Sequence, residues 1–278
     1  MHLHKLHATG NDFLVYSLLD GAPPPSAVLA AALCDRHTGV GADGLLLLGP
    51  GYDGADCTMT LHNADGGLAE MSGNGSRCLA WAAARAGLGT DTELVVDTGG
   101  GRRTIRLERD ATGEVVAAET DMGPVTFDPA EIPLAADSPF GLEATFHGTL
   151  YEGDAAGVGN PHWVLFVEDP ATARVTQHGP HLEVDERFPK RTNVEFVRVD
   201  DRTHLTMRVW ERGVGETQSC GTGACASVAV AHRRGLVEPT VDVAVLGGTL
   251  RVTVGATVTL AGPVVHVFDV DVDPDRLG

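Results

Sequence analysis

The sequence contains no apolar run that approaches the roughly 20 residues a membrane-spanning helix needs. It is also poor in basic residues, because 20 Lys and Arg stand against 38 Asp and Glu and give a formal net charge of −18. A chain with this charge repels phosphate backbones and anionic lipid surfaces. We therefore expect no nucleic acid and no membrane as partners, and we expect the ligand to be a small molecule.

Paired cysteines are missing as well. The five cysteines are an odd number, and none belongs to a C-x-x-C pair. The opening residues, MHLHKLHATGNDF, have no apolar core of the kind that secretory signals contain. We therefore expect a cytoplasmic protein with reduced thiols. The alternation of His2, His4 and His7 is interpreted as the pattern of a first strand, and no metal is predicted.

The sequence resembles itself at an offset of about 148 residues, and at 278 residues it is long enough for two domains. Landmarks recur in the same order: SGNG at 72–75 and CGTG at 220–223, Gly87-Leu88 and Gly235-Leu236, Gly10-Asn11 and Gly159-Asn160. A recurring offset of this kind indicates a duplicated unit.

Each half has a β-rich opening, a Gly-rich loop, one Ala-rich helix and then alternating strands. The helices are expected over 77–86 and 224–234, each followed by a glycine that favours a helix end. Small and apolar residues cover nearly all of their faces, which indicates buried central helices. We predict an α+β protein with two pseudo-symmetric domains.

The residue before each Gly-rich loop is a candidate for chemistry. Helix N-termini bind anions such as carboxylates, and Ser72 and Cys220 stand at these two positions. A thiol there is expected to have a lowered pKa, which makes Cys220 the leading catalytic candidate. Residues 221–226 also fit the G-x-G-x-x-A dinucleotide fingerprint. Because no clean strand precedes them and no βαβ alternation surrounds them, we expect no nicotinamide or flavin cofactor.

Longer motifs resemble those of the diaminopimelate epimerase family. They are HATGNDF at 7–13, NADGGLAEMSGNGSRC at 63–78, GNPH at 159–162, RTNVEFV at 191–197 and WERGVGETQSCGTGAC at 210–225. The resemblance covers essentially the whole chain. It implies a cofactor-independent epimerase that interconverts LL- and meso-diaminopimelate in lysine and peptidoglycan precursor biosynthesis.

The same resemblance implies a fold in which each domain is a strongly curved, mostly antiparallel sheet wrapped around a central helix. The N-terminal domain is expected over 1–118, with 262–278 returning to it, and the C-terminal domain over 119–261. A homodimer is also implied. Phe268 takes a position that is often Tyr in the family and is linked there to the dimer contact.

Roles carry over to this sequence position by position. Ser72 and Cys220 would be the two acid/base residues, one for each face of the α-carbon, and His162 and Glu211 would tune their pKa values. The implied substrate contacts are amides, charged side chains and loop backbone groups: Asn11, Asn63, Gly73, Asn74, Asn160, Asn193, Glu211, Arg212, Gly221 and Thr222.

One catalytic position departs from the family, which has Cys where this chain has Ser72. A hydroxyl is a far weaker acid than a thiol. Either the serine was introduced in the laboratory to capture a substrate complex, or this chain works with Ser72, helped by His162. Two other functions also stay open: a racemase of another polar amino acid such as histidine, and a non-catalytic relative that binds an amino acid.

Overall fold

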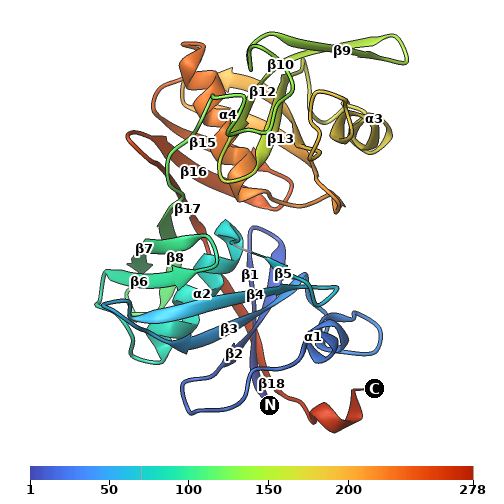
Figure 1. Ribbon diagram of the computed structural model, residues 1–278. Helices are drawn as coiled ribbons and strands as arrows, with labels where there is room; N and C mark the ends of the chain where they lie inside the picture. Colours follow the sequence, from blue (N-terminus) through green and yellow to red (C-terminus); the bar gives the residue numbers. More distant parts are fainter. Residues whose placement is uncertain (70, 278) are drawn as a thin grey trace. The chain divides into compact units, whose positions relative to one another are not determined.

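The structure is a computed structural model that describes residues 1–69 and 71–277. It divides into two compact units (Figure 1). Unit 1 contains Met1–Asp121 and the chain from Ala261 onward, and unit 2 contains Met122–Leu260. Among the described helices, none combines the length and the apolar character that crossing a membrane requires.

Unit 1 is a curved sheet with two helices. Its elements are β1 (His2–Ala8), β2 (Asn11–Ser17), α1 (Ala27–Cys34), β3 (Gly44–Pro50), β4 (Cys57–Asn63), β5 (Leu68–Ala69), α2 (Gly73–Arg85), β6 (Glu93–Thr98), β7 (Gly101–Arg109), β8 (Val115–Asp121), β18 (Val265–Asp271) and the short 3-10 helix η1 (Pro274–Arg276). Strand β1 pairs antiparallel with both β2 and β18. Strand β2 then pairs parallel with β3, and β3 antiparallel with β4.

Unit 2 repeats this plan. Its elements are β9 (Leu142–Phe146), β10 (Thr149–Gly157), β11 (Pro161–Phe166), α3 (Val175–Glu183), β12 (Asn193–Asp201), β13 (His204–Glu211), β14 (Gly215–Glu216), α4 (Gly221–Arg233), β15 (Thr240–Val245) and β16 (Gly248–Val254), after which β17 (Val258–Pro263) carries the chain back to unit 1. Strand β10 pairs antiparallel with β9 and β11, β11 parallel with β12, and β12 antiparallel with β13. The expected α+β class, with few helices and a large curved sheet, is confirmed.

The pairing registers fix which residues of the two units correspond. Phe13 pairs with Gly44 across β2 and β3, just as His162 pairs with Asn193 across β11 and β12. Gly44 in turn pairs with Asn63 on β4. In unit 2, Glu211 at the end of β13 lies opposite Asn193, as Asn63 lies opposite Gly44 in unit 1. This follows because the adjacent residues Val194 and Trp210 are paired.

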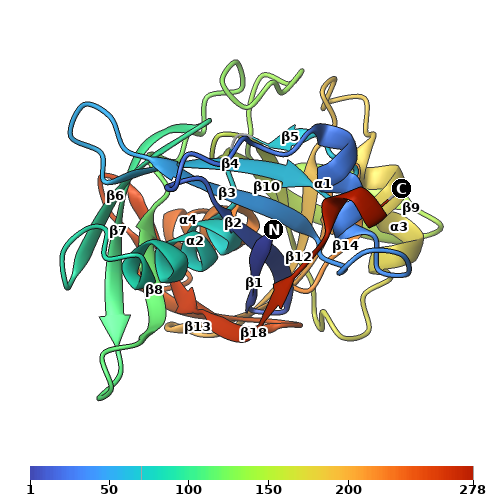
Figure 2. The ribbon, with the colours of Figure 1, turned by 90° about the horizontal axis from the view of Figure 1, so that it is seen from below.

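Each central helix is buried inside its unit. In unit 1, α2 contacts β1, β2, β3, β4, β7 and β8, and the strands around it are seen in Figure 2. Its residues Leu79 and Trp81 join a core with Phe13 and Leu46 from the sheet. In unit 2, α4 contacts β10 to β13 and β16. The alanines of both helices allow this close wrapping because they are small on every face.

The two central helices begin earlier than the sequence predicted. Helix α2 starts at Gly73 rather than at 77, and α4 starts at Gly221 rather than at 224. The Gly-rich segments are therefore first helical turns and not loops, because a side-chain cap at Ser72 or Cys220 compensates for the weak helix propensity of glycine. The glycines at 87 and 235 have positive φ values of 78° and 72°, as expected just beyond helix ends.

Candidate active site

The two central helices have the same type of N-terminal cap. Ser72 and Cys220 are both extended, and each side chain accepts a hydrogen bond from the backbone N–H three residues later. The distance is 3.0 Å from Gly75 N to Ser72 Oγ and 3.4 Å from Gly223 N to Cys220 Sγ. The two candidate acid/base residues are thus held at the positive end of a helix dipole, each in its own unit.

A strand passes directly beneath each first turn. A Cβ built on Gly75 would lie 3.2 Å from Leu46 Cδ2, and one built on Gly223 would lie 2.7 Å from Glu195 Oε1. A Cβ at position 223 would displace the Glu195 carboxylate from its present place. The two units therefore share their backbone geometry but place different chemistry below the helix, hydrocarbon in unit 1 and a carboxylate in unit 2.

Glu195 and His162 form a buried pair in unit 2. Glu195 Oε1 lies 2.6 Å from His162 Nδ1, and both side chains are fully buried. The other ring nitrogen, Nε2, lies 2.8 Å from Asn160 Oδ1. Because a carboxylate only accepts hydrogen bonds, Nδ1 carries the proton of the first contact. Glu195 Oε2 is buried and has no hydrogen-bond partner among the described residues.

Cys220 and Glu211 carry raised pKa values. Burial raises the pKa of Cys220 well above that of a free thiol, and the nearby carboxylates of Glu211 and Glu195 act in the same direction. Burial also raises the pKa of Glu211, although a hydrogen bond from the Thr217 hydroxyl opposes this. The expectation of a lowered thiol pKa is therefore wrong. Desolvation and two like charges outweigh the helix N-terminus.

Two further residues of the expected site brace the backbone near Glu211. Asn193 is 3% exposed, its Oδ1 accepts from Arg212 N at 2.9 Å, and its Nδ2 donates to Pro161 O at 2.9 Å. The guanidinium of Arg212 is exposed and donates to Lys190 O at 3.2 Å. Asn193 thus fixes the ends of two neighbouring strands, while Arg212 presents its charge to solvent.

In unit 1, a buried arginine supports the first turn of α2. Arg77 is fully buried, and its guanidinium donates to Gly73 O at 3.0 Å and to Asn74 Oδ1 at 2.7 Å. The amide nitrogen of Asn74 then donates to Asn11 Oδ1 at 3.1 Å. Asn63 lies exposed at the end of β4. The structure therefore links Asn11 and Asn74 directly, and it does not link them to Asn63.

The units differ at the positions that surround their capping residues. By strand register, Phe13 corresponds to His162, Leu46 to Glu195 and Asn63 to Glu211. These unit 1 side chains cannot take up or release a proton near neutral pH. Cys220 therefore has a titratable neighbourhood within its own unit, and Ser72 has none at the matching positions.

Sequence reasoning missed Glu195 and Arg77 as members of the site. Both lie inside quoted motifs, RTNVEFV and SGNGSRC. A charged residue within an otherwise apolar strand or helix was the available signal, because such a residue is rarely fully buried without a specific partner.

Sequence comparisons with known proteins match the same family over most of the chain. The sequence profile of the family described as diaminopimelate epimerase matches residues 3–127 and 155–267. The chain belongs to this family. A family member from Xanthomonas euvesicatoria is 40% identical over 274 residues, which cover 95% of this chain and 94% of that protein. One from Desulfitobacterium hafniense is 41% identical over 276 residues, 96% of each chain.

The fold of this family member also occurs in more distant enzymes. A crystal structure of a hydroxyproline epimerase from Agrobacterium vitis matches with a TM-score of 0.75 at 19% sequence identity, covering 97% of this chain and 91% of that one. At this identity the likeness concerns the fold alone.

Glu211→Gln should stabilise the protein at alkaline pH. The pKa of Glu211 is raised in the folded protein above its ordinary value of 4.5. The protonated carboxyl therefore contributes its full stability below pH 4.5, and this contribution is lost as the pH rises through the folded-state pKa. Glutamine does not ionise. We expect the variant to exceed the parent in free energy of unfolding at pH 8, by a difference that shrinks toward pH 4.5.

Urea unfolding at both pH values measures this difference. Glu108→Gln, which removes an exposed carboxylate from β7, serves as the control. A Glu211→Gln variant less stable than the parent at pH 8 would show that the ionised carboxylate is well accommodated.

Proposed function

We propose that this chain is a cofactor-independent epimerase that interconverts LL- and meso-diaminopimelate by two-base proton transfer at the α-carbon. The supporting observation is the matched pair of capped helix N-termini, one in each unit, with Ser72 and Cys220 as the capping residues. Membership of the family makes diaminopimelate the expected substrate. The reaction would serve lysine and peptidoglycan precursor biosynthesis.

The raised pKa of Cys220 means that its resting form is the thiol. To act as a base, the thiol first passes its proton to the Glu211 carboxylate, and the thiolate then takes the α-proton. In the opposite direction the thiol gives its proton to the carbanion, and Glu211 returns a proton to the sulfur. Glu211 is thus assigned as the proton store for Cys220.

We propose that backbone N–H groups in the two first turns, at Gly73-Asn74 and Gly221-Thr222, bind the substrate's reacting carboxylate. Charge that develops on this carboxylate when the α-proton leaves is stabilised by both helix dipoles. The distal amino-acid end needs donors and acceptors together. Amides and one guanidinium supply these: Asn11, Asn63, Asn160, Asn193 and Arg212.

Hydrogen exchange should differ between the two substrate isomers. In the protein with Ser72, we expect the isomer that presents its α-hydrogen to Cys220 to exchange it with deuterated solvent much faster than the other isomer, and net epimerisation to be slow. Ser72→Cys should raise the epimerisation rate by about 10²- to 10⁴-fold, because it supplies a second thiol acid/base. Proton NMR in deuterated buffer follows both events.

Cys220→Ser should abolish exchange from both isomers. Cys225→Ser is the matched control, because Cys225 is buried in the same helix but does not cap it. Equal exchange from both isomers, with no gain from Ser72→Cys, would show that Ser72 is a competent acid/base by itself. Binding of diaminopimelate without any exchange would identify a binding protein, and faster turnover of L-histidine would identify a different racemase.

We further propose that Glu195 is a positioning residue that orients His162. Glu195→Gln keeps the side-chain shape but removes the charge that holds the Nδ1 proton. We expect kcat to fall roughly 10- to 100-fold with little change in KM, and the pH profile of kcat to shift. Glu183→Gln, which alters another buried carboxylate of unit 2, should leave the pH profile unchanged. A pH profile of kcat in Glu195→Gln that matches the parent would show that Glu195 has only a structural role.

We also propose a cytoplasmic homodimer. Support comes from the five free cysteines, which a reducing compartment would preserve, and from Val265, Val267 and Phe268 of β18, which are 44, 52 and 42% exposed. Phe268→Asp should convert a dimer into a monomer of 29.0 kDa in light scattering. Val28→Asp, at an exposed position of α1, should leave the mass of the parent unchanged. A monomeric parent protein would contradict the dimer.

A further inference from the structure

A cluster of imidazoles and carboxylates joins the first and last strands of unit 1. Strands β1 and β18 are antiparallel, with His2 opposite Asp271 and His4 opposite Asp269. His4 Nδ1 lies 2.6 Å from Asp269 Oδ1, and His266 Nε2 lies 2.7 Å from the same oxygen. Donor atoms of His2, His4 and Asp269 all lie within 4.8 Å of one another. Two imidazoles therefore contact the Asp269 carboxylate, and a third, His2, lies close to it.

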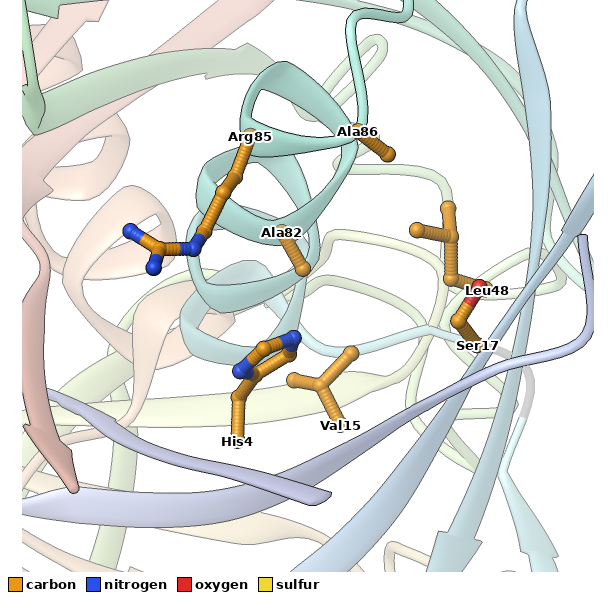
Figure 3. Close-up of a pocket in the computed structure, with 7 residues that line it drawn as sticks. All are labelled: His4, Val15, Ser17, Leu48, Ala82, Arg85 and Ala86. Atoms are coloured by element: carbon orange, nitrogen blue, oxygen red, sulfur yellow. The ribbon is translucent and has the colours of Figure 1, made fainter. Parts of the chain in front are cut away.

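Packing against α2 holds two of these rings in place. The His266 ring stacks on Trp81 with centroids 4.6 Å apart, and the His4 ring meets the same indole edge-on at 5.5 Å. Figure 3 shows His4 beside Ala82 of α2 and Val15 of β2, in a hollow of unit 1. The orientation of the donor atoms is thus set by packing against residues that would not contact a bound ion.

The charge of the cluster suits a divalent cation. The Asp269 carboxylate lies within hydrogen-bond distance of both His4 and His266. Asp271 adds a second carboxylate 3.0 Å from His2. Arg85 also lines the hollow, but its guanidinium lies over the Trp81 ring and within 4.0 Å of Glu114.

We propose that His2, His4 and Asp269 bind one Zn²⁺ ion, with His266 as the fourth donor. Imidazole nitrogen and carboxylate oxygen are preferred zinc ligands, and donors around tetrahedral zinc stand about 3.3 Å apart. The donor atoms of His2, His4 and Asp269, now within 4.8 Å of one another, would move closer on binding the ion. The sequence favoured strand alternation for the histidines, and only the register with β18 reveals their shared carboxylate. The ion would cross-link strands from the two ends of the chain, and so it stabilises unit 1.

The test is zinc titration of the chelator-treated full-length protein without an affinity tag. We expect one Zn²⁺ per chain by calorimetry and a rise of several degrees in Tm. Cys220→Ala is titrated in parallel, because a thiol beside Glu211 is a competing zinc ligand. Asp269→Asn and His4→Gln should each weaken binding at least roughly tenfold, since each removes one ligand. Both replacements keep the size of the side chain.

His204→Ala is the matched control. His204 forms an exposed pair with Asp201 at 2.9 Å in unit 2 and should not contribute to binding. No saturable zinc binding by Cys220→Ala would overturn the proposal, as would parent-like affinity in Asp269→Asn. Epimerase activity is a separate readout, and its loss or absence leaves the binding result unaffected.

Discussion

The close approach of one strand to the first turn of each central helix is the constraint on which the rest of the structure depends. Gly75 rests on Leu46 and Gly223 on Glu195, and a Cβ added at position 223 would push the Glu195 carboxylate away. At the start of each helix, the side chain of Ser72 or Cys220 caps a first turn whose glycines are buried.

The same contact makes the two halves electrostatically different. In unit 2 it places a carboxylate beneath the helix, where Glu195 pairs with His162 and adds its negative charge to that of Glu211 beside Cys220. In unit 1 the matching strand residue is Leu46. A duplicated backbone can therefore carry different chemistry in its two halves, because the strand residue below the helix differs between the units.

The internal offset predicted the fold class and singled out Ser72 and Cys220, because the Gly-rich segments recur at the same place in both halves of the chain. Three features lay beyond the sequence. Helix starts at Gly73 and Gly221 depend on side-chain caps that weak glycine propensity conceals. The raised pKa of Cys220 depends on burial, which no motif encodes. Glu195 enters the site only through the register of β12, and a linear motif does not show which face of a strand points to a helix.

The first turns of the two central helices lie beside buried charges of opposite sign. Beneath the serine half, the Arg77 cation contacts Gly73 O and Asn74, and a buried cation favours negative charge nearby. Around the cysteine half, Glu195 and Glu211 favour the protonated thiol. The two halves of a duplicated backbone thus differ in the sign of the charge beside the helix start, and this difference, rather than the backbone geometry, distinguishes the surroundings of Ser72 and Cys220.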